Sequence, residues 1–294
     1  MADVTVTPAY SSYKTIKVGI DSNGVAIIMF DRPKELNAVG SIDLNEVRNA
    51  IERLQTDDSC KVIILTGSGR AFSAGATLTD PNSRYGVRIN PPVSELEHRD
   101  PGGPLAFALE NSKKVTIAAV QGVAVGIGAT MICAMDIRVS YKENRIGFVF
   151  NRRGIVPESM STYFVPKLIG MSRALALFLT GAILPCSHPT LQPLFHELVD
   201  KPDQVLPKTV ALATDIAKNC SVPANAAIKA LVRNGADSSE EQHVLDSRAL
   251  HALVVGNPID VNEGTVSFLE KRDAVFKGTV KDIPSFIPWW KSKI

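Results

Sequence analysis

The stretch VTIAAVQGVAVGIGATMICAMDIRVS, residues 115–140, decides the fold of this chain. It opens with an apolar run of β-forming residues at 115–120, passes through the glycines of Gly126-Ile127-Gly128 into an apolar helical segment at 129–134, and ends in a second strand-like run at 137–141. A strand that turns through glycines into a helix aims free main-chain N–H groups at whatever lies above the turn. The pattern therefore predicts either a ligand-facing turn or, more simply, close packing of a helix on a strand.

Composition and charge exclude several classes of protein. The 294 residues are 45% hydrophobic and 21% charged, which is typical of a globular protein, and the net charge of +2 with scattered basic residues argues against a nucleic-acid surface. No apolar run has the length of a membrane span, and the N-terminal residues lack the apolar core of a secretory signal. The four cysteines have neither metal-ligand nor disulfide-framework spacing, which favours a reduced intracellular compartment and predicts no metal. They are Cys60, Cys133, Cys186 and Cys220.

Strands and helices alternate in the first two thirds of the chain, and helices dominate the rest. Two strands at 16–20 and 25–30 flank a turn with Gly24, a helix capped by Ser41 follows, and 62–66 forms a buried strand. This order predicts an α/β protein of stacked β-β-α units. We expect a flexible N-terminus at 1–13, a core at 14–200 and a helical C-terminal region with its tail at 201–294, with helices near 159–168, 172–180, 207–219, 223–234, 239–255 and 258–272 and a short strand at 197–199.

Residues 79–104 interrupt this alternation. The segment is rich in proline, glycine and charge and has little periodicity, and a short helix begins at 105–109 after it. A long irregular segment inside a compact domain is usually a functional lid or a partly disordered loop.

A second glycine turn follows another buried strand, in RAFSAGATL at residues 70–78. Two such turns can converge two main-chain N–H groups on one oxygen, which is the requirement of an oxyanion hole. The sequence therefore predicts a site built from the main chain of two turns.

Four segments together resemble the signatures of the crotonase (enoyl-CoA hydratase/isomerase) superfamily. They are RPKELNAV, RAFSAGATL, VQGVAVGIGATMICAMDIRVS and NEGTVSFLEKRDAVFKG, which occur in the family's order between Arg32 and Gly278. The resemblance implies the crotonase spiral of β-β-α units with a C-terminal helical trimerisation region. It also implies a homotrimer or a dimer of trimers that binds acyl-CoA thioesters, with no cofactor besides the coenzyme A of the substrate.

The resemblance carries functional roles over to particular positions. Ala76 and Ile127 are expected to stabilise an enolate oxygen through their N–H groups, and the isoleucine stands where many relatives have glycine. Substrate contacts are implied for Lys34, Leu36, Ala38, Ala74, Thr77, Leu78, Gly126, Phe268 and Lys271, of which the last two often come from a neighbouring subunit.

The departures from the family pattern bear on the activity. Typical hydratases of the family use two glutamates to activate water, but Thr130 and Phe150 occupy these positions here. Glu158, after Pro157, resembles the catalytic acid of peroxisomal Δ3,Δ2-enoyl-CoA isomerases and dienoyl-CoA isomerases. A proline and a glutamate at a helix start also serve simple capping. We expect Glu158 to remove the proton at C2 of a 3-enoyl-CoA and return it at C4, which moves the double bond to give the 2-enoyl-CoA. Asn151 is expected to contact either the site or the nearby main chain.

Other functions remain open from the sequence. Glu158 alone can serve a hydratase or dehydratase, the fold can hydrolyse thioesters, and a non-catalytic homologue can bind acyl-CoA or RNA. Asp80, Glu95 and Glu97 are the alternative bases. The final Ser292-Lys293-Ile294 resembles the C-terminal peroxisomal signal with isoleucine in place of leucine, so we expect a peroxisomal location, or otherwise a cytoplasmic one.

Overall fold

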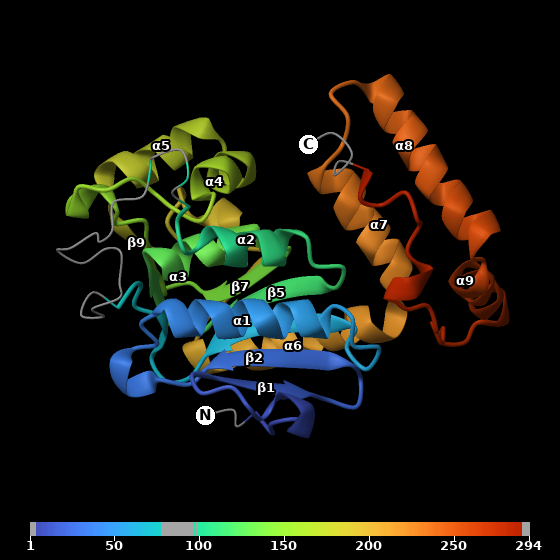
Figure 1. The fold of residues 1–294 in the computed structure, drawn as a ribbon, viewed down its shortest axis with the longest axis horizontal. Helices are drawn as coiled ribbons and strands as arrows, with labels where there is room; N and C mark the ends of the chain where they lie inside the picture. Colours follow the sequence, from blue (N-terminus) through green and yellow to red (C-terminus); the bar gives the residue numbers. More distant parts are fainter. Residues whose placement is uncertain (1–3, 78–93, 95–96, 98, 290–294) are drawn as a thin grey trace.

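The structure of the protein is a computed structural model that describes residues 4–77, 94, 97 and 99–289 (Figure 1). The predicted substrate contact Leu78, the alternative bases Asp80 and Glu95, most of the segment 79–104 and the tripeptide Ser292-Lys293-Ile294 lie outside the described residues.

A six-stranded sheet forms the centre of the core. Its strands are β1 (Ile16–Ile20), β2 (Val25–Phe30), β3 (Val62–Gly67), β5 (Val115–Val120), β7 (Ile137–Tyr141) and β10 (Glu197–Val199), in the order β1-β2-β3-β5-β7-β10. β1 and β2 pair antiparallel across a turn in which Gly24 has a φ of 84°, and the other neighbours are parallel. The six strands lie at or within a residue of the positions predicted from the sequence.

A second, four-stranded sheet of three-residue strands lies beside the first. It comprises β4 (Ala71–Ser73), β6 (Val123–Val125), β8 (Arg145–Gly147) and β9 (Ile183–Pro185), in the order β4-β6-β8-β9. None of these four strands was predicted, because three residues are too few to show an alternating pattern. Each of β4, β6 and β8 follows a strand of the larger sheet, so the chain repeats a β-β unit three times, as the crotonase spiral requires.

Both faces of the larger sheet are buried. Along β3, the side chains of Ile63 and Leu65 join the core cluster that contains helix α1 (Ser41–Leu54) and residues of α2 (Gly103–Glu110). Val62 and Ile64 point the other way and pack with residues of α6 (Pro202–Asn219). Because burial stabilises each such side chain by about 1.5–3 kcal/mol, the two-sided cover fixes the register of the parallel strands.

The helices differ from the prediction mainly at their ends. The predicted N-cap Ser41 is wrong: Gly40 is the N-cap of α1, and its N–H donates to the Asp43 carboxylate over 2.8 Å. Helix α6 begins at Pro202 rather than 207, because proline fits the first helical position. The remaining helices are α3 (Ile127–Thr130) with a 3-10 turn at Met131–Ala134, α4 (Ser161–Ile169), α5 (Met171–Thr180), α7 (Val222–Arg233), α8 (Ser239–His251) with a π-helical turn at Ala252–Gly256, and α9 (Ile259–Glu270).

The two ends of the chain relate differently to the core. Of the N-terminal segment, residues 4–13 lie against it, and the buried Tyr10 donates its hydroxyl to Asp57 over 2.7 Å. At the other end, α7, α8 and α9 form a lobe beside the core (Figure 1). Within the described ranges, no helix has both the length and the apolar character needed to cross a membrane.

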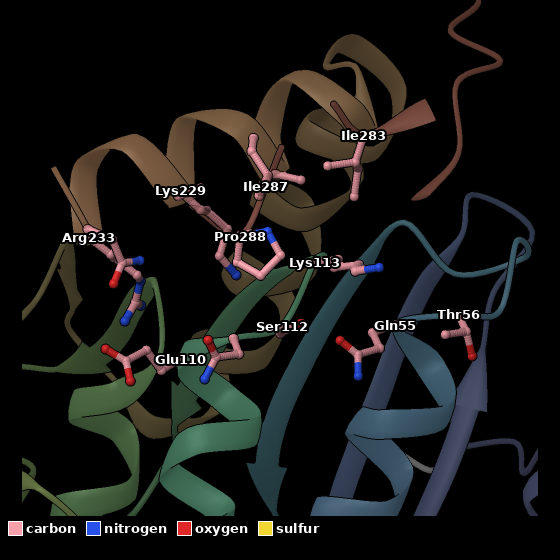
Figure 2. Close-up of a pocket in the computed structure, with 14 residues that line it drawn as sticks. Gln55, Thr56, Glu110, Ser112, Lys113, Lys229, Arg233, Ile283, Ile287 and Pro288 are labelled. Carbon is pink, nitrogen blue, oxygen red and sulfur yellow. The ribbon is translucent and has the colours of Figure 1, made fainter. Parts of the chain in front are cut away.

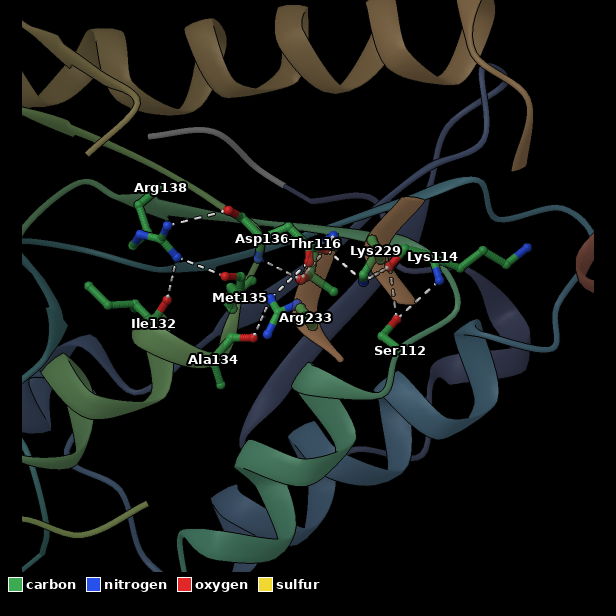
Figure 3. Close-up of polar contacts among 10 residues, drawn as sticks. All are labelled: Ser112, Lys114, Thr116, Ile132, Ala134, Met135, Asp136, Arg138, Lys229 and Arg233. Carbon is green, nitrogen blue, oxygen red and sulfur yellow. Dashed lines mark hydrogen bonds and ion pairs between the residues drawn. The ribbon is translucent and has the colours of Figure 1, made fainter. Parts of the chain in front are cut away.

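An ion-pair cluster joins α7 to the core (Figure 3). The Asp136 carboxylate, whose side chain is 13% exposed, lies 2.7 Å from Lys229 Nζ and 2.9 Å from an Arg233 guanidinium nitrogen, and it accepts the N–H of Thr116 over 2.8 Å. Burial alone would raise the pKa of Asp136, but the charges of Lys229 and Arg233 outweigh burial and lower it. This cluster fixes the point at which the helical lobe leaves the core.

A pocket lies at the same joint (Figure 2). One wall comes from the C-terminal ends of α1 and α2 and the other from α7 and the tail. Its lining residues include Gln55, Glu110, Lys113, Arg233, Ile287 and Pro288, and none of the residues predicted to bind substrate. Burial raises the pKa of Glu110, against the charges of Arg233 and Lys167.

Asp136→Asn should lower the free energy of unfolding by about 3–5 kcal/mol at pH 7, because it leaves two largely buried cations without their anion. The pKa of Asp136 is lowered in the folded protein, so its contribution is present above the unfolded pKa of about 3.9 and is lost as the pH falls through the folded pKa. Urea unfolding at pH 7 and below pH 4 measures both effects.

Asp200→Asn is the matched control, since it removes an exposed ion pair with Lys142 and should change the stability little. If the two variants are equally stable at pH 7, the Asp136 cluster does not hold the joint.

Candidate active site

The two glycine turns predicted from the sequence meet in the structure. Gly75 and Gly126 have φ values of 94° and 54°, in the left-handed region that favours glycine. A Cβ atom on Gly75 would lie 2.9 Å from the main-chain oxygen of Val125, and one on Gly126 would lie 3.8 Å from the Cα of Gly75. The main chains are therefore in contact, which places the following residues, Ala76 and Ile127, on adjoining turns.

Hydrogen bonds to a third segment orient the Ala76 peptide. Val39 donates its N–H to Gly75 O over 2.8 Å and accepts the N–H of Thr77 over 3.0 Å, while Ala74 donates to Leu36 O over 2.9 Å. Because the C=O and N–H of one trans peptide point in opposite directions, and Gly75 O points to Val39, the N–H of Ala76 points away from Val39. Within the part of the chain that the structure describes, this N–H has no acceptor.

Ile127 offers a second N–H group at the start of α3. Gly126 is the N-cap, with a ψ of −126°, and its own N–H donates to Gly147 O over 3.0 Å. The first N–H groups of a helix have no acceptor within the helix, and none is found for Ile127 among the described residues. The N–H of Ile127 therefore lies at the N-terminal end of a short helix, beside the turn that carries Ala76.

The segment behind these turns is held by polar side chains. The buried Asn37 donates to the carbonyls of Ser68 and Ala71 over 2.9 and 2.8 Å and accepts the N–H of Arg32 over 3.0 Å. The Arg32 guanidinium donates to Ala38 O and lies 3.1 Å from Asp43. These bonds fix the main chain of the predicted substrate contacts Leu36 and Ala38.

Glu158 lies at the turn before α4 and is 9% exposed. The helix begins at Ser161, two residues later than predicted, because Ser159 and Met160 have left-handed φ values of 53° and 55°. The main-chain oxygen of Glu158 accepts the N–H and the hydroxyl of Ser161 over 3.0 and 2.7 Å. Glu158 therefore precedes the N-cap Met160, outside the first turn of the helix.

Gly102, the N-cap of α2, connects this turn with the two glycine turns. A Cβ atom on Gly102 would collide with Ser159 Oγ and would lie 3.1 Å from Ile127 Cδ1. The residue after Glu158 and the side chain of Ile127 thus pack against the same glycine. Neither Gly102 nor Ser159 was predicted from the sequence, because their roles depend on a contact between residues far apart in the chain.

The other candidates are placed as follows. Thr130 is buried and donates its hydroxyl to Ile127 O over 3.3 Å, and Phe150 lies in the core, so neither position carries an acid. Asn151 donates to the main-chain oxygen of Leu179, which satisfies the backbone rather than the site. Glu97 is exposed.

Burial raises the pKa of the Cys133 thiol to about 12, which keeps it protonated and excludes it as a nucleophile at neutral pH.

The three remaining predicted substrate contacts are exposed. Lys34 is exposed on the segment that also carries Leu36 and Ala38. Phe268, which is 82% exposed, and Lys271 lie at the end of α9, on the far side of the chain from α3 (Figure 1). Neither residue of α9 reaches the site of its own chain.

The two sheets, the spiral of β-β-α units and the paired main-chain amides define a protein of the crotonase fold. A family model described as enoyl-CoA hydratase/isomerase matches residues 21–279. The chain therefore belongs to the enoyl-CoA hydratase/isomerase family and is an enzyme of the kind that this family comprises.

Individual relatives cover most of the chain. An enoyl-CoA hydratase of Alternaria alternata is 39% identical over 90% of this chain and 86% of its own. A 1,2-epoxyphenylacetyl-CoA isomerase of Escherichia coli is 28% identical over 87% of this chain and 95% of its own. The crystal structure of an enoyl-CoA hydratase of Bacillus anthracis is similar with a TM-score of 0.78 and 26% identity, over 90% of this chain and all of the other.

Gly75→Ala should lower the turnover of an enoyl-CoA substrate by about 10²–10³-fold, the usual effect of losing one oxyanion donor. The new methyl group would meet Val125 O and force the two turns apart. Steady-state kinetics together with a melting temperature measures the effect.

Gly170→Ala is the control, because Gly170 has a φ of 84° but open space around its Cα. An alanine there also takes a positive φ but meets no neighbouring atom, so its turnover should stay near that of the wild type. Equal losses in both variants would show that the contact between the turns is unimportant for activity.

Proposed function

We propose that the protein moves the double bond of a 3-enoyl-CoA thioester into conjugation, giving the 2-enoyl-CoA. One observation carries this proposal. The two positions at which family hydratases use glutamate hold Thr130 and Phe150, whereas Glu158 lies at a turn that packs beside Ile127. One carboxylate suffices for isomerisation, because the proton that leaves C2 can return at C4 from the same base.

The proposed reaction begins at the thioester. The Glu158 carboxylate takes a proton from C2, and the electron pair delocalises over a dienolate that extends from the thioester oxygen to C4. The N–H groups of Ala76 and Ile127 donate to that oxygen, and one such donor is worth about 3 kcal/mol in the transition state. Glu158 then returns the proton to C4, which leaves the double bond between C2 and C3.

The substrate-binding part of the proposal follows the same segments. Leu36 and Ala38 offer main-chain groups to the coenzyme A, Lys34 offers a charge to its phosphates, and Ala74, Thr77 and Gly126 line the thioester. The fixed main chain of the segment around Asn37 supports these roles, because a rigid segment loses little entropy when it binds a ligand.

Hydration of a 2-enoyl-CoA with Glu158 as the acid and base is the second candidate. It is favoured by the relatives, since the Alternaria and Bacillus proteins are named as hydratases. Incubating the purified protein with 3-enoyl-CoA and with 2-enoyl-CoA separates the two candidates, if double-bond position and water addition are followed independently.

Glu158→Gln should lower isomerisation by at least about 10²–10⁴-fold and leave the affinity for a CoA thioester nearly intact. The amide keeps the size of the side chain but cannot accept the C2 proton. Kinetics on a 3-enoyl-CoA and calorimetric titration with a non-reacting thioester measure the two quantities.

Glu97→Gln is the control, because Glu97 is the exposed carboxylate proposed above as an alternative base. It should keep the turnover of the wild type. Near-native isomerisation by Glu158→Gln would contradict the proposed mechanism, while a wild type that binds the CoA thioester without converting it would favour a non-catalytic acyl-CoA-binding protein.

We further propose that the protein assembles as a homotrimer or a dimer of trimers through its helical lobe. Large apolar side chains of α8 and α9 are exposed in the single chain, and such side chains favour association where they gather on one surface. They are Val244 and Leu250 of α8 and Phe268 and Leu269 of α9. In such an assembly, Phe268 and Lys271 become available to the site of a neighbouring subunit.

Phe268→Asp with Leu269→Asp should weaken this assembly, because charges would be buried at the interface. Sedimentation should show a multiple of the 31.7 kDa chain for the wild type and smaller species for the variant. A monomeric wild type would exclude the proposed trimer.

A further inference from the structure

We infer that Asp100 is a positioning residue that holds Glu158 beside the oxyanion-forming turns, an inference that rests on the proposed function. The Oδ1 atom of Asp100 accepts three main-chain N–H groups. They belong to Gly102 at 3.0 Å, Gly103 at 2.9 Å and Ser159 at 3.1 Å. The first two begin α2, and the third directly follows Glu158, so one carboxylate oxygen joins two segments that are far apart in the sequence.

The turn at Glu158 needs an external support. Ser159 and Met160 both adopt left-handed φ values, which residues other than glycine seldom hold unless the surroundings enforce them. Ser161 secures one side of the turn through the main-chain oxygen of Glu158, and Asp100 secures the other through the N–H of Ser159. Ser159 is 1% exposed, so without Asp100 its N–H would lack ready access to water.

Asp100 acts where the turn of Glu158 meets the two glycine turns. Gly102 contacts both Ser159 and the side chain of Ile127, and it has no room for a side chain of its own. Asp100 binds Gly102 and Ser159 together and thus fixes the distance between Glu158 and the Ile127 N–H. Proton transfer is sensitive to such distances, and a displacement of about 1 Å can cost about 10²-fold in rate.

The role of Asp100 requires an acceptor oxygen rather than a proton carrier. Its Oδ1 atom is occupied by three N–H donors, and an asparagine presents a carbonyl oxygen of the same size to the same donors. An alanine presents none. Comparing Asp100→Asn with Asp100→Ala therefore separates a positioning role from the mere presence of a carboxylate.

Asp100→Ala should lower kcat for the 3-enoyl-CoA by about 10–100-fold and leave KM nearly unchanged, because the base moves while the coenzyme A contacts do not. Asp100→Asn should restore most of kcat. The control is Asp21→Ala, which removes a comparable support: Asp21 Oδ1 accepts the N–H groups of Asn23 and Val25 over 2.8 and 2.9 Å in the β1–β2 turn. Its kcat should match the wild type.

The inference is overturned if Asp100→Ala keeps the wild-type kcat, if Asp100→Asn loses as much as Asp100→Ala, or if Asp21→Ala shows the same loss. Glu158→Gln is assayed beside these variants. Retained turnover in Glu158→Gln overturns the proposed function and the positioning role together. An inactive Glu158→Gln beside a fully active Asp100→Ala overturns the positioning role alone.

Discussion

The contact between the main chains of Gly75 and Val125-Gly126 is the constraint on which the rest of the site depends. Two parallel strands normally carry side chains that keep the loops beyond them apart. Here the absence of a Cβ atom at Gly75 lets the turns touch, and the positive φ values of Gly75 and Gly126 are open to glycine at little cost. This approach brings the N–H groups of Ala76 and Ile127, which lie about fifty residues apart in the sequence, onto adjoining turns, as the proposed stabilisation of one oxygen requires.

Polar side chains surround this contact and keep it rigid without entering the chemistry. Asn37 and Arg32 hold the segment that backs the Ala76 turn, and Asp100 holds the turn that carries Glu158. Each of them binds main-chain groups, so each satisfies buried donors or acceptors while fixing a loop. Side chains of neighbouring segments therefore hold the loops that form the site in place. This compensates for the lack of regular secondary structure around the site.

Sequence reasoning recovered what depends on local pattern and missed what depends on contacts across the chain. The strands Val62–Gly67 and Val115–Val120 are buried on both faces and appear as unbroken apolar runs, so they were predicted within a residue. The three-residue strands Ala71–Ser73 and Val123–Val125 have no such pattern. The glycine turns were found through their composition, whereas Asp100 was not, because an aspartate in an irregular segment has no distinguishing local pattern.

The positions at which the fold does and does not carry a carboxylate bear on the choice between isomerisation and hydration. A hydratase with two carboxylates uses them together to activate water. Thr130 instead bonds its own helix and Phe150 fills the core, which removes both groups that would activate water. Glu158 comes from the turn before α4, which approaches the oxyanion-forming turns through Gly102. A base that acts alone can return the same proton to the substrate, and this is the chemical basis on which we propose isomerisation rather than hydration.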